Sequence, residues 1–295
     1  LASLTLFKQL YGSHPYANPS VGTAETVPMI SRKQLQDFHR TYYTAENAQI
    51  ALVGDLTLAQ AQAISEKVTA RLPRGTTAAK TVNPIARSAS QTHIEFPSTQ
   101  TQIFLAQLAV KRGDPDYPAL FLGNQIFGGG GFGTRLMEEV REKRGLTYGI
   151  YSSFSPMQAA GPFMISVKTR AQLSQATLEF IQELLRDYIA NGPTQSELDR
   201  AKRESLGSFP LSAASNASIV GQMAAIGFYD MPLTWLNDFM QDLQKLTVTD
   251  VHEAFKRHFN PDQLIIVTAG LTVTQHHFPN SVVHTKVTQP MERQH

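Results

Sequence analysis

The chain has 295 residues, of which 42% are hydrophobic and 17% are charged, and its formal net charge is +2. These values are typical of a globular protein of about two domains with a sizeable core. The basic residues form no runs, which argues against a nucleic-acid surface, and no apolar stretch reaches membrane-spanning length. The absence of cysteine excludes disulfides and cysteine-ligated zinc.

The first part of the chain is predicted to contain short helices separated by loops. Leu1–Tyr11 has the pattern of the end of a helix, and Pro15–Pro28 that of a loop marked by proline and glycine. Ser31 is a candidate N-cap for the helix that follows it. A strand is predicted at Gln49–Val53, and a second helix at Leu58–Leu72, whose apolar residues recur on one face.

The rest of the chain is predicted to be a linker followed by an α+β unit. Residues 71–91 are rich in Thr, Ala, Pro and Ser and lack periodicity, as expected of a linker. A mixture of strands and helices follows, which predicts a two-layer α/β sandwich with a mainly antiparallel sheet. The predicted strands are Thr92–Phe96, Gln102–Val110, Leu146–Ser155, Phe163–Thr169 and a last one ending at Gly270. The predicted helices are Tyr117–Phe127, Thr134–Lys143, Ser174–Ala190, one opening with the capping box Thr194 to Glu197, Trp235–Gln244 and Val248–His258.

Two segments of the chain repeat one another. Ile30–Asp55 and Leu246–Leu271 align without a gap at an offset of 216, and each reads as a helix, a polar turn and an apolar strand ending in Gly. The second copy closes a unit that begins near Thr92, so the same offset predicts that roughly 125 residues of the first unit are absent. The expected organisation is a truncated first domain, a linker, a complete second domain and a polar tail, at residues 1–73, 74–91, 92–271 and 272–295.

Few residues in this sequence are candidates for chemistry. No two of the nine histidines have the i, i+4 spacing of a helical zinc site, so no metal site is predicted on this chain. The glycine run Gly128–Gly133 lacks the lysine of a P-loop and follows a helix rather than a strand. It is either a tight connection between two helices or a mobile loop facing a peptide. By composition alone, Glu138–Tyr148 is a solvated helix face followed by a residue at a sheet edge.

Several separated motifs resemble one family. GGGGFGTRLMEEVREKRGLTYGIYSSFSP, RGDPDYPALFLGNQIFGGG before it and GPTQSELDRAK after it are similar to the C-terminal domain of the pitrilysin/insulinase/mitochondrial-processing-peptidase family of zinc metallopeptidases. HPYANPSVGTAETV resembles the end of that family's N-terminal catalytic domain. The resemblance covers nearly the whole chain up to about Leu271. It implies a tandem homologous repeat of α+β domains with the LuxS/processing-peptidase-like metallohydrolase fold.

The resemblance implies which parts of an active site this chain holds. The family's zinc motif, H-x-x-E-H, is absent, and the helix equivalent to the zinc helix offers Phe121, Asn124 and Gln125 instead. It therefore implies zinc in the full-length protein and none bound by this chain. Arg141 and Tyr148 match an Arg/Tyr pair of the family's second domain that donates to the substrate carbonyl and oxyanion. The expected substrate-binding loop consists of Gly128, Gly129, Gly130, Gly131 and Gly133.

Together these features predict the substrate-binding C-terminal part of a zinc metalloendopeptidase, active as the full-length protein and inactive as this chain alone. One alternative is a non-catalytic partner or scaffold subunit of a two-chain peptidase, and another is an interaction domain without a peptidase role. The expected partners are a peptide substrate and a homologous subunit or a second copy. The residues do not encode the compartment, but similarity to exported bacterial family members favours a soluble periplasmic protein.

Overall fold

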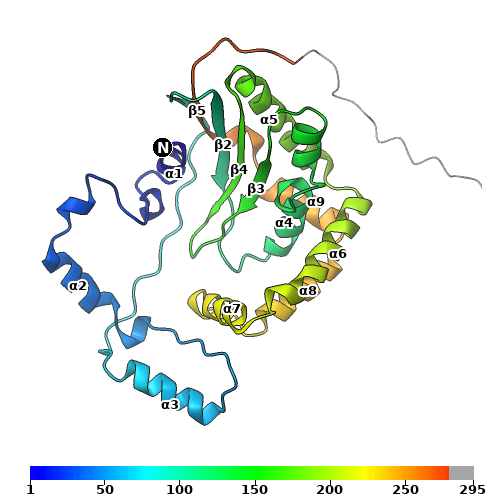
Figure 1. Ribbon diagram of the computed structural model, residues 1–295. Helices are drawn as coiled ribbons and strands as arrows, with labels where there is room; N and C mark the ends of the chain where they lie inside the picture. Colours follow the sequence, from blue (N-terminus) through cyan, green and yellow to red (C-terminus); the bar gives the residue numbers. More distant parts are fainter. Residues whose placement is uncertain (279–295) are drawn as a thin grey trace, which may run out of the picture.

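The computed structural model describes residues 1–278, and its centre is one five-stranded sheet (Figure 1). The strands are β1 (Ser90–Glu95), β2 (Gln100–Leu108), β3 (Ile150–Phe154), β4 (Pro162–Arg170) and β5 (Ile265–Gly270). They lie in the order β1-β5-β2-β4-β3. β1 runs parallel to β5, while the other three neighbouring pairs are antiparallel. The sheet is therefore mixed, with one parallel pair among antiparallel ones. β5 inserts between the first two strands of the chain, an order that was not predicted.

Helices of the second part of the chain cover one face of this sheet (Figure 1). The helices that pack there are α4 (Tyr117–Asn124), α5 (Ser174–Asn191), α6 (Gln195–Ser212), α8 (Trp235–Lys245) and α9 (Val248–His258). α7 (Asn216–Phe228) lies away from the sheet, and Ile226 is its one buried residue. The core under them is apolar, and Phe255 of α9 and Ile181 of α5 are fully buried. Burying each such side chain stabilises the fold by about 1.5–3 kcal/mol. The predicted capping box of Thr194 and Glu197 at the start of α6 is confirmed, whereas α7 was not predicted.

A helix from the first part of the chain covers the opposite face of the sheet. α1 (Ala2–Tyr11) packs on β5 and β2, as Figure 1 shows. Leu6 and Leu10 of α1 are buried against Ala106 and Val267. The predicted two-layer arrangement is thus extended by a third layer over part of the sheet, and this layer comes from α1, which precedes the predicted linker.

The following segment of the first part is largely exposed. α2 (Arg32–Tyr42) and α3 (Leu58–Thr69) contain no buried residue, although Ser31 forms the predicted N-cap of α2 as part of a capping box. The strand predicted at Gln49–Val53 does not form, since no other strand within residues 1–278 lies beside it. β5, its counterpart in the second copy of the repeat, has a hydrogen-bonded strand on each side. An apolar pattern alone does not make a strand when the ladder partners are missing.

Candidate functional site

The predicted glycine loop leaves α4 through a π-helical turn. This turn spans Gln125–Gly129 and continues α4 directly. A Cβ on Gly128 would lie 2.5 Å from Ser152 Oγ, so the backbone approaches β3 closely here. Gly131 and Gly133 have φ angles of 78° and 80°, which residues with a side chain rarely adopt. The run is therefore a connection between two helices whose course depends on glycine.

A buried polar pair fixes this loop to the sheet. Ser152 of β3 donates from Oγ to Asn124 Oδ1 at 2.6 Å, and Asn124 Nδ2 donates to the backbone carbonyl of Ser152 at 3.2 Å. Both residues are buried. Since buried polar groups are costly without partners, the two hydrogen bonds specify where α4 ends relative to β3. No sequence pattern indicates this role of Asn124, which was considered only as a residue that does not ligate zinc.

Arg141 faces the glycine loop. It belongs to a second π-helical turn, Met137–Glu142, and its guanidinium carbon lies 5.0 Å from the centroid of the Phe132 ring. Phe132 lies within the glycine loop and is 73% exposed. Among residues 1–278, Arg141 has no acidic partner, whereas the neighbouring Lys143 is paired with Glu139 at 2.6 Å. The Arg141 fork is thus available to an external acceptor.

Tyr148 lies at the entrance of the edge strand β3 and is 90% exposed. The turn that carries it is held by Thr147, whose Oγ1 accepts from the Gly149 N–H at 3.1 Å and donates to the Gly149 carbonyl at 2.9 Å. The structure brings Arg141 and the glycine loop together through Phe132. In the described part of the chain, no hydrogen bond or ring contact joins Tyr148 to either of them.

The downstream end of the loop is anchored by Arg135. Its guanidinium donates to both carboxylate oxygens of Glu197, at 2.7 and 2.8 Å, and to the Gly192 carbonyl at 3.0 Å, and it lies over the ring of Tyr188. Burial acts to raise the pKa of Glu197, but the hydrogen bonds from Arg135 and Thr194 outweigh it and hold that pKa below its usual range. This pair joins the glycine loop to the α5–α6 connection and was not singled out from the sequence.

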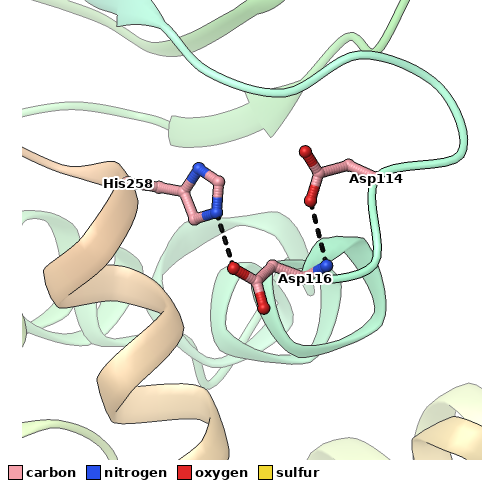
Figure 2. Close-up of side chains that lie close together, drawn as sticks. All are labelled: Asp114, Asp116 and His258. Atoms are coloured by element: carbon pink, nitrogen blue, oxygen red, sulfur yellow. Dashed lines mark hydrogen bonds and ion pairs between the residues drawn. The ribbon is translucent and has the colours of Figure 1, made fainter.

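One group in the described part of the chain has the composition of a metal site. Figure 2 shows Asp114, Asp116 and His258, whose possible ligand atoms all lie within 4.8 Å of one another. His258 Nε2 is 2.8 Å from Asp116 Oδ2, and Arg257 contacts both oxygens of the same carboxylate at 2.7 and 3.1 Å. Hydrogen bonds from Arg257, followed by those from His258, lower the pKa of Asp116. Because Arg257 already compensates this charge, the group fits an ion pair joining α4 to α9 better than a cation site.

Helix α4 does not provide a zinc-ligand set. Phe121 packs against Phe239 with ring centroids 5.4 Å apart, Asn124 is bonded to Ser152, and Gln125 begins the π-helical turn. None of these is a histidine, cysteine or carboxylate, the donors that zinc uses. The residues present therefore do not fit zinc at this position.

Comparison with known proteins assigns the chain to a family. The sequence model described as the peptidase M16 inactive domain matches residues 29–205, more than half of the chain. The chain belongs to the peptidase M16 inactive-domain family. The matched range of this M16 domain includes the glycine loop, Arg141 and Tyr148, and it confirms the family resemblance drawn from the motifs.

Several relatives of this M16 domain are known. The crystal structure of a peptidase M16 inactive domain from Pseudomonas fluorescens is 56% identical, with a TM-score of 0.91 over 94% of this chain and 66% of that one. The "Non-peptidase homolog YmxG" of Helicobacter pylori is 26% identical over 88% of this chain and 60% of its own length. An "Uncharacterized zinc protease" of Mycobacterium tuberculosis is 26% identical over 84% of this chain and 57% of its own. The chain thus spans about 60% of the length of these two curated relatives.

No sequence pattern indicates the π-helical geometry of the two candidate elements. Both candidate elements, the glycine loop and the Arg141 segment, contain π-helical turns. Such turns are rare in proteins as a whole, but those that occur are often found at functional sites. Within residues 1–278, no helix has the length and hydropathy needed to span a membrane.

Proposed function

We propose that this M16 inactive domain forms the substrate-facing part of a zinc endopeptidase, in which Arg141 and Tyr148 donate hydrogen bonds to the peptide being cleaved. The arrangement of Arg141 carries the proposal. Its guanidinium has no acidic partner in the described part of the chain, yet it is held over Phe132 of the glycine loop. Structural arginines nearby, such as Arg135, are instead bound to carboxylates.

The two side chains supply complementary donors. The Arg141 fork is suited to bind a substrate carbonyl in a fixed direction, because its donors are coplanar and always charged. The Tyr148 hydroxyl is suited to donate to the oxyanion that forms when the carbonyl is attacked, and such a donor contributes a few kcal/mol to the transition state. Zinc bound elsewhere in the full-length protein would polarise the carbonyl and lower the pKa of the attacking water. No residue of α4 would hold that metal.

The substrate backbone is proposed to lie along β3. This strand is an edge of the sheet, so its outer backbone groups are available to an added strand. The loop glycines Gly129 and Gly130, which precede β3 in the chain, are also exposed. An extended peptide would gain main-chain hydrogen bonds from β3, while the glycines permit close backbone approach. Export to the periplasm is proposed on the likeness to bacterial family members.

Residues 1–73 are proposed to be the end of an incomplete first domain, followed by a linker at 74–91 and the second domain at 92–271. The burial of aligned residues supports this organisation. In the second copy of the repeat, the apolar positions of α9 and β5 are buried, whereas their counterparts at the offset of 216 are exposed. The pairs, with exposed fractions, are Leu35 at 59% and Val251 at 0%, Tyr43 at 57% and Phe259 at 6%, and Ile50 at 44% and Ile266 at 5%.

A second candidate function is that of a non-catalytic partner subunit, acting with a homologous chain or a second copy. The name of the Helicobacter pylori relative as a non-peptidase homolog favours it, while the mycobacterial relatives are named zinc proteases. Zinc content separates the two functions. The endopeptidase proposal predicts one zinc ion per full-length chain, whereas a partner subunit would bind none and would act only when a zinc-bearing chain is added.

The test is peptide cleavage by the full-length protein carrying Arg141→Ala. We expect kcat/KM to fall about 100-fold, as for loss of one preorganised donor. Lys143→Ala is the matched control, because Lys143 is a neighbouring cation already engaged by Glu139, and its loss should leave cleavage within about twofold of wild type. Equal activity of the Arg141→Ala and Lys143→Ala proteins would exclude the assigned role of Arg141.

A further inference from the structure

A separate pocket lies where four distant segments of the chain meet. Its volume is about 310 Å³, and its walls come from residues 80–83, the loop after β2, the β3–β4 connection and the α7–α8 turn. The charged residues in its lining are Lys80, Lys111, Arg112 and Asp230. Three cations against one carboxylate give the pocket a net positive charge, although the whole chain is nearly neutral.

Arg112 is held in this pocket without an acidic partner. Its guanidinium carbon lies over two aromatic rings, 5.8 Å from the centroid of Tyr117 and 5.1 Å from that of Tyr229. Its Nε is buried and has no hydrogen-bond acceptor. No carboxylate pairs with it within residues 1–278. A guanidinium stacked on aromatic faces is preorganised, and the carboxylate that such a group ordinarily binds is missing.

The rim of the pocket already shows one carboxylate bound to a cation. Asp230 Oδ2 lies 3.5 Å from Lys80 Nζ. Asp230 also has φ of 52°, the only positive φ of a residue other than glycine in the described part of the chain. It ends α7 with hydrogen bonds from Asp230 N to Gly227 O and from Met231 N to Ile226 O, a cap that glycine usually supplies. Asp230 is therefore held in a backbone conformation that is unfavourable for a residue with a side chain, and its carboxylate lies against Lys80 of the pocket.

We propose that this pocket binds the carboxylate of an Asp or Glu side chain in an extended peptide, with Arg112 as the main donor and Lys111 and Lys80 at the rim. The planar fork of Arg112 matches a carboxylate. Tyr229 and Phe228 in the same lining offer apolar surface to the methylene groups of the ligand. The site is distinct from Arg141 and Tyr148, so it does not depend on the proposed peptidase role.

The first test compares two blocked peptides in NMR titrations of the whole chain, acetyl-Ala-Glu-Ala-amide and acetyl-Ala-Gln-Ala-amide. The Glu peptide should bind saturably with Kd on the order of 1 mM, and the Gln peptide at least tenfold more weakly. Arg112→Gln should weaken binding of the Glu peptide at least tenfold. Lys111→Gln, which leaves the aromatic stacking intact, should weaken it about threefold. Lys67→Gln on α3, outside the pocket, is the control and should change nothing.

The second test is a gain of affinity. Asp230→Asn removes the competing carboxylate, and Asn tolerates positive φ, so the cap should persist while the Glu peptide binds about threefold to tenfold more tightly. If Asp230 had only a structural role, its replacement by Asn would not increase the affinity for the Glu peptide. The proposal is overturned if the Gln peptide binds as well as the Glu peptide, if Asp230→Asn does not increase affinity, or if inorganic phosphate binds more tightly than the Glu peptide.

Discussion

Phe259 and Tyr43 are aligned in the two copies of the internal repeat, but only Phe259 is buried. The Phe259 ring lies 4.7 Å from the centroid of Phe163 and 4.9 Å from that of Phe255. Replacing a buried phenylalanine by alanine costs about 3–5 kcal/mol, so we expect that loss for Phe259→Ala. Tyr43 is 57% exposed, and Tyr43→Ala should change the stability of this chain by no more than about 0.5 kcal/mol.

Urea unfolding, monitored by tryptophan fluorescence, measures the loss of unfolding free energy in both variants. Trp235 is the single tryptophan and stacks on Phe239, so its emission reports the packed second part of the chain. The unfolding midpoint should fall for Phe259→Ala with an unchanged slope, and stay constant for Tyr43→Ala. A Tyr43→Ala cost above about 1 kcal/mol would refute the reasoning, because side chains this exposed cannot contribute so much. In the full-length protein, the proposed first domain should bury Tyr43 and raise that cost to about 2 kcal/mol or more.

Two further predictions concern the glycine loop and its anchor. Gly128→Ala should destabilise the chain by about 1–3 kcal/mol, because the added Cβ would clash with Ser152. Gly131→Ala meets no atom within 4 Å and should cost only about 1 kcal/mol, for its positive φ. Equal losses of unfolding free energy for the two variants, measured by urea unfolding, would argue against the close packing of Gly128. The lowered pKa of Glu197 means that its pairing with Arg135 contributes fully above pH about 4.5 and is lost as the pH falls through the lower folded-state value. The stability difference between wild type and Glu197→Gln should therefore shrink on acidification below pH about 4.5, and a constant difference would show that the pair does not contribute.

The helices and their caps were the most predictable part of this fold. Ser31 and Thr194 begin helices with capping boxes because the signal is local, a side chain and a residue three positions later. Gln49–Val53 shows that a local apolar pattern does not predict a strand by itself. Its apolar pattern matches β5, but a strand needs hydrogen-bond partners, and only β5 has them. The insertion of β5 between β1 and β2 likewise depends on contacts that no sequence window contains.

A sequence motif supplies the candidate site residues, whereas their geometry comes only from the structure. The motif identified Arg141 and the glycines, and the structure places them together through Phe132. The buried bond between Asn124 and Ser152 joins residues 28 positions apart, so neither residue signals it alone. Arg112 was likewise part of a recognised motif, and only the fold shows that two tyrosines hold it without a carboxylate. Such pairings arise from tertiary packing and become visible only with coordinates.

The most direct test of the proposed role is the kcat/KM of peptide cleavage by the full-length protein with Tyr148→Phe, compared with Tyr151→Phe. Both substitutions remove one hydroxyl from an exposed tyrosine at the β3 edge, so they differ only in the assigned donor. We predict a loss of about 100-fold for Tyr148→Phe and none beyond about twofold for Tyr151→Phe. Equal cleavage by the two proteins would contradict the assignment of Tyr148 as the oxyanion donor.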